Sequence, residues 1–204
     1  MKEYRSPILV FFHGDALAHT IRPLVISRAL TVRGFSVSFA GRGIHASRIR
    51  EEGFEVLDCV SMPQSRMDEY LARGDDAYYD TGWVEQCVDS ERRLIQLIKP
   101  ALIVSDMKPT TRISASLEGV DLAVVKQGYE QPGYPFAPSR GLFRRRKELA
   151  PFAGCLLRHA SEIRPNHLIS LMADIPELHP FPGRGPRKGW HLSLIHISEP
   201  TRPY

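Results

Sequence analysis

The stretch Pro7-Ile-Leu-Val-Phe-Phe12 is nearly all apolar and rich in residues that favour strands. Such a run predicts a strand that is buried on both faces, as in a parallel sheet. A loop is predicted over residues 13–19, which contain Gly14 and Asp15. A helix capped by Thr20 is expected next, because the apolar residues that follow recur at helical spacing.

The alternation of strands and helices continues along the chain. Gly34 ends the first predicted helix. The later predicted segments are strands at 35–40, 54–60, 101–104, 122–125 and 168–172, helices at 44–52, 83–98, 110–117 and 141–160, and a polar insertion with one short helix at 62–82. Strands joined by helices nearly always form a right-handed parallel sheet. The sequence therefore predicts the α/β class, with a Rossmann-like, doubly wound parallel sheet.

Length and composition are those of an ordinary globular chain. With 204 residues, of which 43% are hydrophobic and 25% charged, the chain suits one α/β domain, or one large domain with an incomplete second one. No apolar run approaches the roughly 20 residues of a membrane span. The N-terminus lacks the apolar region of a signal peptide, so we expect a cytoplasmic protein. The net charge of +4 is weak support for a polyanionic ligand, and no nucleic-acid partner is expected.

The cysteines indicate neither disulfides nor a metal site. Cys59, Cys87 and Cys155 are odd in number and widely spaced, so a disulfide framework is not expected. The sequence contains no Cys-x-x-Cys pair or histidine cluster that would indicate zinc. We therefore expect no metal ligands.

The last residues are expected to have a different origin. Residues 192–204 read LSLIHISEPTRPY, which resembles the in-frame translation of a transposase-type sequencing-library adapter. Such scars are excluded from reasoning about the fold. The alternative interpretation is a natural C-terminal strand over 192–197. If the tail is adapter-derived, the reading frame continued past Leu192.

Predicted topology alone places two polar side chains together. In open α/β sheets, ligands bind beyond the carboxyl ends of the strands. His19 follows the first strand at a helix N-terminus, and Asp106 lies just past the strand at 101–104. A histidine whose second nitrogen is held by a carboxylate is a standard general-base pair. The alternative is that His19 is a loop histidine and Asp106 caps the next helix.

Three stretches, taken in order, resemble one family of enzymes. They are 14–37, with its Ala18-His19 dipeptide, 99–122, with the run Lys99-Pro-Ala-Leu-Ile-Val-Ser-Asp106, and 172–180. Their order and spacing are similar to the N-terminal half of GT-B glycosyltransferases. These include the family 1, UDP-glycosyltransferase-like enzymes that act on lipophilic natural products, and related bacterial glycolipid transferases. The resemblance covers most of residues 7–190.

The chain departs from the family pattern at three positions. Ala18 replaces the glycine before the family's histidine, Ser36 replaces a histidine, and Asp121 stands where proline is usual. Only Ala18 is near the expected chemistry. Its Cβ would disfavour a positive φ in the loop.

The resemblance implies a domain plan. Residues 1–180 would form an acceptor-side Rossmann-like domain, 181–191 would begin an interdomain linker, and 192–204 would be the adapter-derived tail. The family's second domain carries most contacts to the nucleotide-sugar, and nothing after Gly189 supplies them. The chain alone is therefore expected to be inactive. No cofactor is implied besides the nucleotide-sugar co-substrate.

The resemblance also implies roles for site residues. His19 would deprotonate an acceptor hydroxyl and Asp106 would hold His19, so that the acceptor oxygen attacks the sugar's anomeric carbon with inversion. Gly14, Asp15 and Ala18 would lie near the donor phosphates, at a helix N-terminus that favours anions. The alternative for this loop is an ordinary strand-to-helix turn.

Two further segments are candidates for acceptor contacts. By resemblance, Tyr129, Tyr134 and Phe136 would help to line the pocket for a small-molecule or lipid acceptor. The alternative is a surface loop whose aromatic residues fold onto the core. The run Arg144, Arg145, Arg146 and Lys147 offers a peripheral contact to anionic lipid headgroups, or it is a solvated helix face.

Rival functions remain open at this level. One is a non-catalytic acceptor-binding or lipid-binding subunit of a split transferase. Another is a different Rossmann-like nucleotide-binding protein. A dinucleotide enzyme should show Gly-x-Gly-x-x-Gly after the first strand, whereas the loop here has only Gly14.

Overall fold

The computed structural model of the chain describes residues 5–72, 79–126, 142–172 and 190–192. Its strands form one parallel sheet in the order β3-β2-β1-β4-β5-β6-β7. The strands are β1 (Arg5–Phe11), β2 (Phe35–Ala40), β3 (Glu55–Leu57), β4 (Leu102–Asp106), β5 (Asp121–Lys126), β6 (Leu168–Met172) and β7 (Trp190–Leu192). The direction of winding reverses between β1 and β4, which is the Rossmann arrangement. The predicted α/β, doubly wound parallel sheet is therefore confirmed.

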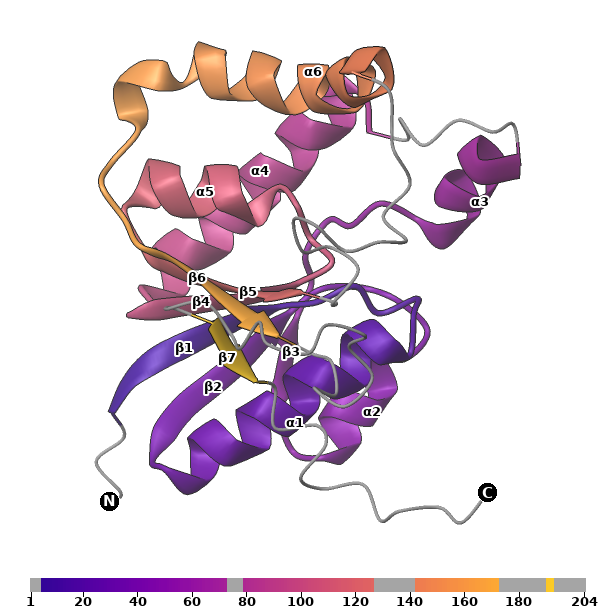
Figure 1. The fold of residues 1–204 in the computed structure, drawn as a ribbon. Coiled ribbons are helices and arrows are strands. Elements are labelled where there is room, and N and C mark those ends of the chain that lie inside the picture. The colour runs from indigo at the N-terminus through magenta and orange to yellow at the C-terminus, as the bar shows by residue number, and fades with distance from the viewer. Residues whose placement is uncertain (1–4, 73–78, 127–141, 173–189, 193–204) are drawn as a thin grey trace, which may run out of the picture.

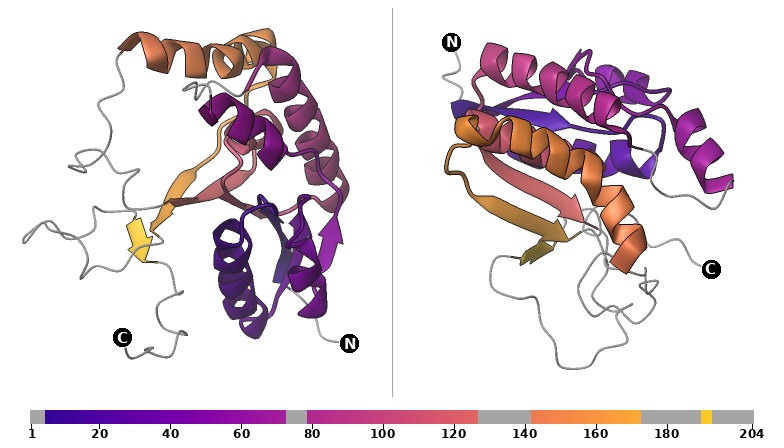
Figure 2. Two further views of the ribbon diagram at one scale, coloured as in Figure 1. Left: turned by 90° about the vertical axis from the view of Figure 1, so that its right-hand side faces the viewer. Right: turned by 90° about the horizontal axis from the view of Figure 1, so that it is seen from above.

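Helices cover both faces of this sheet (Figures 1 and 2). On one face lie α1 (Ala18–Val32) and α2 (Ala46–Glu51), and on the other lie α4 (Thr81–Ile98), α5 (Thr111–Glu118) and α6 (Leu142–Arg158). The short helix α3 (Gln64–Ala72) stands to the side toward which the strands point. A 3-10 turn at Ala160–Glu162 follows α6. None of the helices in the described residues is long and apolar enough to cross a membrane.

The apolar run of β1 explains the two-layered core. Ile8 and Val10 belong to the cluster that contains residues of α1 and α2, whereas Leu9 and Phe11 belong to the cluster that contains residues of α4 and α5. Successive side chains of a strand point to opposite faces, so a strand covered on both sides must be apolar throughout. Burying each such side chain contributes about 1.5–3 kcal/mol. A third cluster, centred on Val88, joins α4, α5 and α6.

The start of α1 differs from the prediction. The helix begins at Ala18, after Leu17, so that His19 lies in its first turn and not in a loop. Thr20 is not the cap, because its side chain is buried inside the helix and its hydroxyl donates to the carbonyl of Ala16 at 3.2 Å. A residue that bonds back to a carbonyl four positions earlier is satisfied within the helix.

Two strands also differ in extent from the prediction. Strand β3 covers only Glu55–Leu57, although 54–60 was expected, because it is an edge strand that pairs with three residues of β2. Strand β7, Trp190–Leu192, pairs with β6 at the end of the stretch expected to be a linker. The other predicted strands and helices of the described residues appear at their expected places.

Candidate functional site

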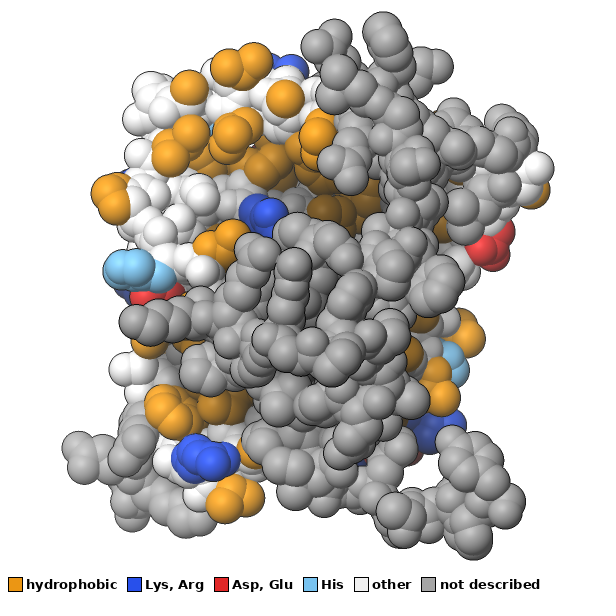
Figure 3. Space-filling model, in the orientation of Figure 1, with side chains coloured by type: hydrophobic (Ala, Val, Ile, Leu, Met, Phe, Trp, Pro, Cys, Tyr) orange, Lys and Arg blue, Asp and Glu red, His pale blue; other side chains and the backbone are white. Residues whose placement is uncertain are grey.

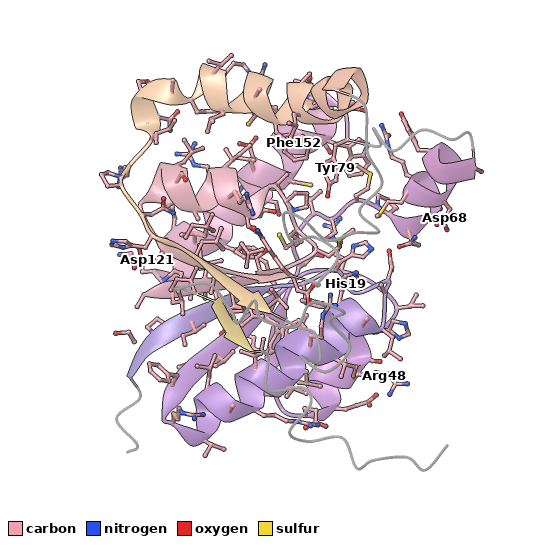
Figure 4. All side chains as sticks on the ribbon, viewed as in Figure 1. His19, Arg48, Asp68, Tyr79, Asp121 and Phe152 are labelled. Atoms are coloured by element: carbon pink, nitrogen blue, oxygen red, sulfur yellow. The ribbon has the colours of Figure 1, made fainter. Side chains whose placement is uncertain are left out.

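The predicted histidine and aspartate are in contact. His19 lies in the first turn of α1, and Asp106 is the last residue of β4. Because β1 and β4 are parallel neighbours, Nδ1 of His19 lies 2.7 Å from Oδ1 of Asp106. The side chain of Asp106 is 1% exposed and that of His19 is 13% exposed. The histidine is therefore partly exposed while its carboxylate partner is enclosed. Figure 4 shows His19 at the end of α1 near the sheet.

Arg22 holds the same carboxylate from the second turn of α1. Its Nε donates to Oδ2 of Asp106 at 2.9 Å, and its Nη2 donates to Oδ1 at 2.8 Å. This bidentate bond compensates the charge of a buried carboxylate. Nη2 also lies 2.5 Å from Nδ1 of His19, because both nitrogens approach Oδ1. Arg22 is not among the site residues predicted from the sequence, although its spacing of three residues from His19 places both on one helix face.

These contacts indicate which nitrogen of His19 is free. Nδ1 lies beside both Oδ1 of Asp106, at 2.7 Å, and Nη2 of Arg22, at 2.5 Å. Because Arg22 already donates to the carboxylate and an ionised carboxylate can only accept, we assign the proton to Nδ1, which donates to Oδ1 of Asp106. The lone pair then lies on Nε2. A neutral imidazole with its second nitrogen held by a carboxylate can accept a proton at Nε2.

A tightly held turn follows Asp106. Met107 has a φ of 55°, in the left-handed region that is costly for a residue with a Cβ. The next residue, Lys108, is buried, and its Nζ donates to the carbonyl of Val60 at 2.8 Å and to Oγ of Ser61 at 3.2 Å. These bonds fasten the turn after β4 to the segment after β3.

Lys108 also pairs with a fully buried carboxylate, that of Glu91 on α4. Nζ lies 3.6 Å from Oε1 of Glu91. Hydroxyls of Thr110 and Ser114 each donate to Glu91 at 2.6 Å. Burial raises the pKa of the Glu91 carboxyl above its usual value, and Lys108 and the two hydroxyls only partly offset that effect. The pair binds the start of α5 to α4, beneath the turn that carries Asp106.

A second histidine, His13, lies beside the pair. It follows β1, is 3% exposed, and its ring centroid lies 6.5 Å from that of His19. Its Nε2 lies 3.3 Å from Oε1 of Gln64 at the start of α3. Burial lowers the pKa of His13 more than the bond to Gln64 and the charge of Asp15 raise it, so His13 is neutral at pH 7.

An apolar cavity of about 700 Å³ opens next to these residues. Ser105 and Met107, the neighbours of Asp106, line its floor, and α5 and α6 form its walls. The lining also includes His13, Met67, Tyr79, Ile113, Phe152 and Leu156. Tyr79 and Phe152 contact each other, with ring centroids 5.2 Å apart, and Figure 4 shows both beside α6. In Figure 3, hydrophobic side chains gather in the same upper part of the molecule.

The size and lining of this cavity are typical of ligand sites. Such sites measure about 300–1,000 Å³ and are mostly apolar with a few polar groups. Here the polar groups include His13 and Lys108. The sequence does not predict this wall, because its residues come from α3, the segment before α4, α5 and α6, and only folding brings those segments together.

The loop at Gly14 is packed against its neighbour loop. The amide of Gly14 donates to the carbonyl of Arg42 at 2.8 Å, and a Cβ at Gly14 would collide with that carbonyl. The carboxylate of Asp15 accepts from the amides of Ile44 and Gln64 at 3.2 and 3.3 Å, so it ties three segments together. Ala18 is exposed and helical, so the positive φ that its Cβ would disfavour is not required.

The remaining candidates cannot be placed. Tyr129, Tyr134 and Phe136 lie outside the described residues. The run 144–147 lies in α6, and its side chains are outside the described part of the structure.

Comparisons with known proteins agree with the fold. No protein-family model matches the chain. A curated protein of Mycobacterium bovis, named an inactive PGL/p-HBAD biosynthesis glycosyltransferase, is 25% identical over 125 residues, which are 60% of this chain and 34% of that protein. A PGL/p-HBAD biosynthesis rhamnosyltransferase of the same species is 24% identical over 128 residues, 63% of this chain and 28% of that protein. The chain thus spans about a third of the length of these relatives.

Solved structures match over a larger share of this chain. The Streptomyces sp. SF2575 glycosyltransferase SsfS6 superposes with a TM-score of 0.60 at 16% identity, covering 90% of this chain and 57% of that one. The spinosyn rhamnosyltransferase SpnG, complexed with thymidine diphosphate, gives a TM-score of 0.61 at 13% identity, covering 90% of this chain and 49% of that one. The curated relatives are glycosyltransferases at low identity, and over about 90% of its length the chain has the Rossmann-like α/β fold of GT-B glycosyltransferase structures.

Proposed function

We propose that this chain is the acceptor-side domain of an inverting glycosyltransferase, which moves a sugar from a nucleotide-sugar to the hydroxyl of a lipophilic acceptor. One observation carries the proposal: the His19–Asp106 hydrogen bond of 2.7 Å lies where the winding of the sheet reverses, beside an apolar cavity. Ligands of open α/β sheets bind at this point of the fold. The glycosyltransferase names of the curated relatives support the same reaction class.

The geometry supports a simple proton transfer. Nε2 of His19 takes the proton of the acceptor hydroxyl while the oxygen forms a bond to the anomeric carbon. The bond from that carbon to the nucleoside diphosphate breaks, the diphosphate leaves, and the configuration inverts. Asp106 stabilises the imidazolium that forms, and Arg22 keeps Asp106 in place. A positioned base of this kind contributes about 10²–10⁴-fold.

The cavity supports a lipophilic acceptor. Its wall contains Tyr79, Ile113 and Phe152, which would bury apolar surface of the acceptor. Neutral His13 offers a hydrogen bond at the end near His19. Tyr129, Tyr134 and Phe136 are proposed to complete the pocket.

We place the donor phosphates near the loop of Gly14, Asp15 and Ala18. Backbone amides and the helix dipole at the start of α1 favour an anion there. Binding of thymidine diphosphate by the structural relative SpnG supports a nucleotide-sugar as donor. Most donor contacts are expected from a second domain, so this chain alone is expected to bind acceptor without transferring sugar. No other cofactor is proposed.

The deciding experiment substitutes His19 by Gln in a protein that joins this domain to a donor-binding domain. We expect kcat to fall by about 10²–10⁴-fold with little change in acceptor affinity, measured by release of nucleoside diphosphate. The matched control is His167→Gln. Among the described residues, His167 also has an aspartate partner, Asp121 at 3.1 Å, but it is exposed at the opposite end of the strands. Turnover that survives in His19→Gln would exclude His19 as the base.

A binding measurement separates transfer from simple acceptor binding. A long-chain alkylphenol, used as a lipophilic hydroxyl probe, is expected to bind the present chain, and Phe152→Ala is expected to weaken that binding. If the probe binds but the joined protein transfers no sugar, the chain is a non-catalytic binding subunit.

Peripheral membrane contact is a separate proposal for the run Arg144, Arg145, Arg146 and Lys147. Each basic residue near an anionic surface contributes about 1 kcal/mol, so replacing the three arginines by alanine should abolish sedimentation with anionic vesicles. Unchanged sedimentation would show that the run is only a solvated helix face.

A further inference from the structure

A second cluster of reactive side chains joins α4 to α6, away from the His19 site. Glu85 comes from α4, Cys155 comes from the last turn of α6, and His159 directly follows the end of α6. The carboxylate, thiol and imidazole each direct one atom into a common space, with all three atoms within 4.8 Å of one another. Cys155 and His159 are four residues apart, so they lie on one face of the helix.

We propose that Glu85, Cys155 and His159 bind a zinc ion that fastens α6 to α4. Thiolate, imidazole and carboxylate are the usual ligands of zinc, and sites with three protein ligands complete the tetrahedron with water. The side chains of Glu85 and His159 are 26% and 23% exposed, whereas Cys155 is fully buried. The fourth position therefore faces solvent, where water can occupy it.

The spacing of the ligand atoms fits a tetrahedral ion. Nε2 of His159 lies 3.5 Å from Oε2 of Glu85, which is long for a hydrogen bond between charged groups. Two ligands with bonds of about 2.1 Å to one zinc, at the tetrahedral angle, lie about 3.4 Å apart. The observed separation of this pair is close to that value, and Sγ of Cys155 lies within 4.8 Å of both atoms.

Residues around the cluster orient its ligands. Nδ1 of His159 lies 2.7 Å from Oε1 of Glu162, so Nδ1 donates its proton there and Nε2 keeps its lone pair for the ion. A carboxylate behind a histidine ligand is the common outer contact of zinc sites. Nε of Arg158 donates to Oε1 of Glu85 at 2.7 Å, which leaves Oε2 facing His159.

The charges of the site also suit a divalent cation. A thiolate and a carboxylate would neutralise zinc, while the cation of Arg158 stays paired with Oε1 of Glu85. Asp89, one turn after Glu85 on α4, adds further negative potential at Cys155.

The proposed zinc site lies close to the wall of the cavity that α6 forms. Phe152, three residues before Cys155, forms part of the cavity wall and packs with Tyr79. An ion that holds α6 to α4 would fix this wall. The sequence showed no zinc spacing because Glu85 and Cys155 come from separate helices.

The test uses the metal-free 204-residue chain and does not depend on sugar transfer. Cobalt(II) is titrated as a spectroscopic substitute, followed by zinc. We expect one ion per chain, a thiolate-to-cobalt absorption band that zinc abolishes, and a zinc-dependent rise in Tm. Cys155→Ser and His159→Gln should each remove the band and the rise in Tm while melting normally without metal. Glu162→Gln should weaken binding by about 10–100-fold.

Matched controls identify the site. Cys87→Ser removes a different buried thiol, which lies on α4, and His167→Gln removes a different histidine with a carboxylate partner. Both variants should bind cobalt as the unchanged chain does. The proposal is overturned if the unchanged chain shows no thiolate band, or if the band persists in Cys155→Ser.

Discussion

Replacing Lys108 by methionine tests how the turn that carries Asp106 is held in place. The substitution keeps an unbranched side chain of similar length but removes the charge. Glu91 then remains fully buried with hydrogen bonds from Thr110 and Ser114 and no cation. The carbonyl of Val60 also loses its donor. We expect a large loss of stability, because an unpaired buried charge is far more costly than an absent pair.

The size of the stability loss can be estimated from the cost of protonating Glu91. Removing one partner of a buried pair costs about 3–5 kcal/mol. The carboxyl can escape part of this cost by taking up a proton, and from its usual pKa of 4.5 this costs about 3.4 kcal/mol at pH 7, at roughly 1.36 kcal/mol per pH unit. We therefore expect a loss of about 3 kcal/mol, which lowers Tm by about 6–12 °C for a chain of this size.

The sign of the pH dependence is also fixed. The pKa of Glu91 is raised in the folded state, and losing Lys108 raises it further. In the unfolded chain the Glu91 carboxyl then releases its proton at a lower pH than in the folded chain. The variant therefore loses stability as the pH rises above the usual pKa of a glutamate carboxyl. Between pH 7 and pH 5 the destabilisation should shrink by up to about 2.7 kcal/mol.

Urea denaturation at pH 5, 6 and 7, followed by circular dichroism, measures these quantities. The double variant Lys108→Met/Glu91→Gln should recover most of the stability and lose the pH dependence, since the amide carries no charge. The reasoning is refuted if Lys108→Met destabilises equally at pH 5 and pH 7, or if the double variant is no more stable than the single one.

Two substitutions test the backbone around the sheet. Lys99 ends α4 with a φ of 50°, so Lys99→Gly should raise the free energy of unfolding by about 0.5–1 kcal/mol; a decrease in urea denaturation would contradict this. Gly43 has a φ of 133°, and a Cβ there would overlap the backbone of Gly14 and Asp15. Gly43→Ala should therefore lower the free energy of unfolding by about 2–5 kcal/mol. A loss of 1 kcal/mol or less would change Tm by only about 2 °C. A Tm that close to the value of the unchanged chain would show that the two loops do not pack as described.

Much of the fold could be predicted from periodicity and turn residues. The apolar run Pro7–Phe12 predicted a strand covered on both faces, and β1 has its side chains in both core clusters. Element ends were less predictable, because tertiary contacts decide them. Threonine often caps helices, yet the hydroxyl of Thr20 donates to the carbonyl of Ala16 and does not cap α1. The edge position of β3 shortens a segment whose sequence would allow a longer strand.

For the site, the sequence predicted that His19 and Asp106 pair, with a loop histidine and a helix cap as the alternative. Topology alone brings residues that follow neighbouring parallel strands to one edge, so His19 and Asp106 could be paired across 87 positions. The folded structure was needed to show that Arg22 shares the carboxylate, that Glu91 and Lys108 are buried together, and that α6 forms a wall of the cavity. Side-chain partners and cavities depend on how helices pack across the sheet, and local sequence patterns do not contain that packing.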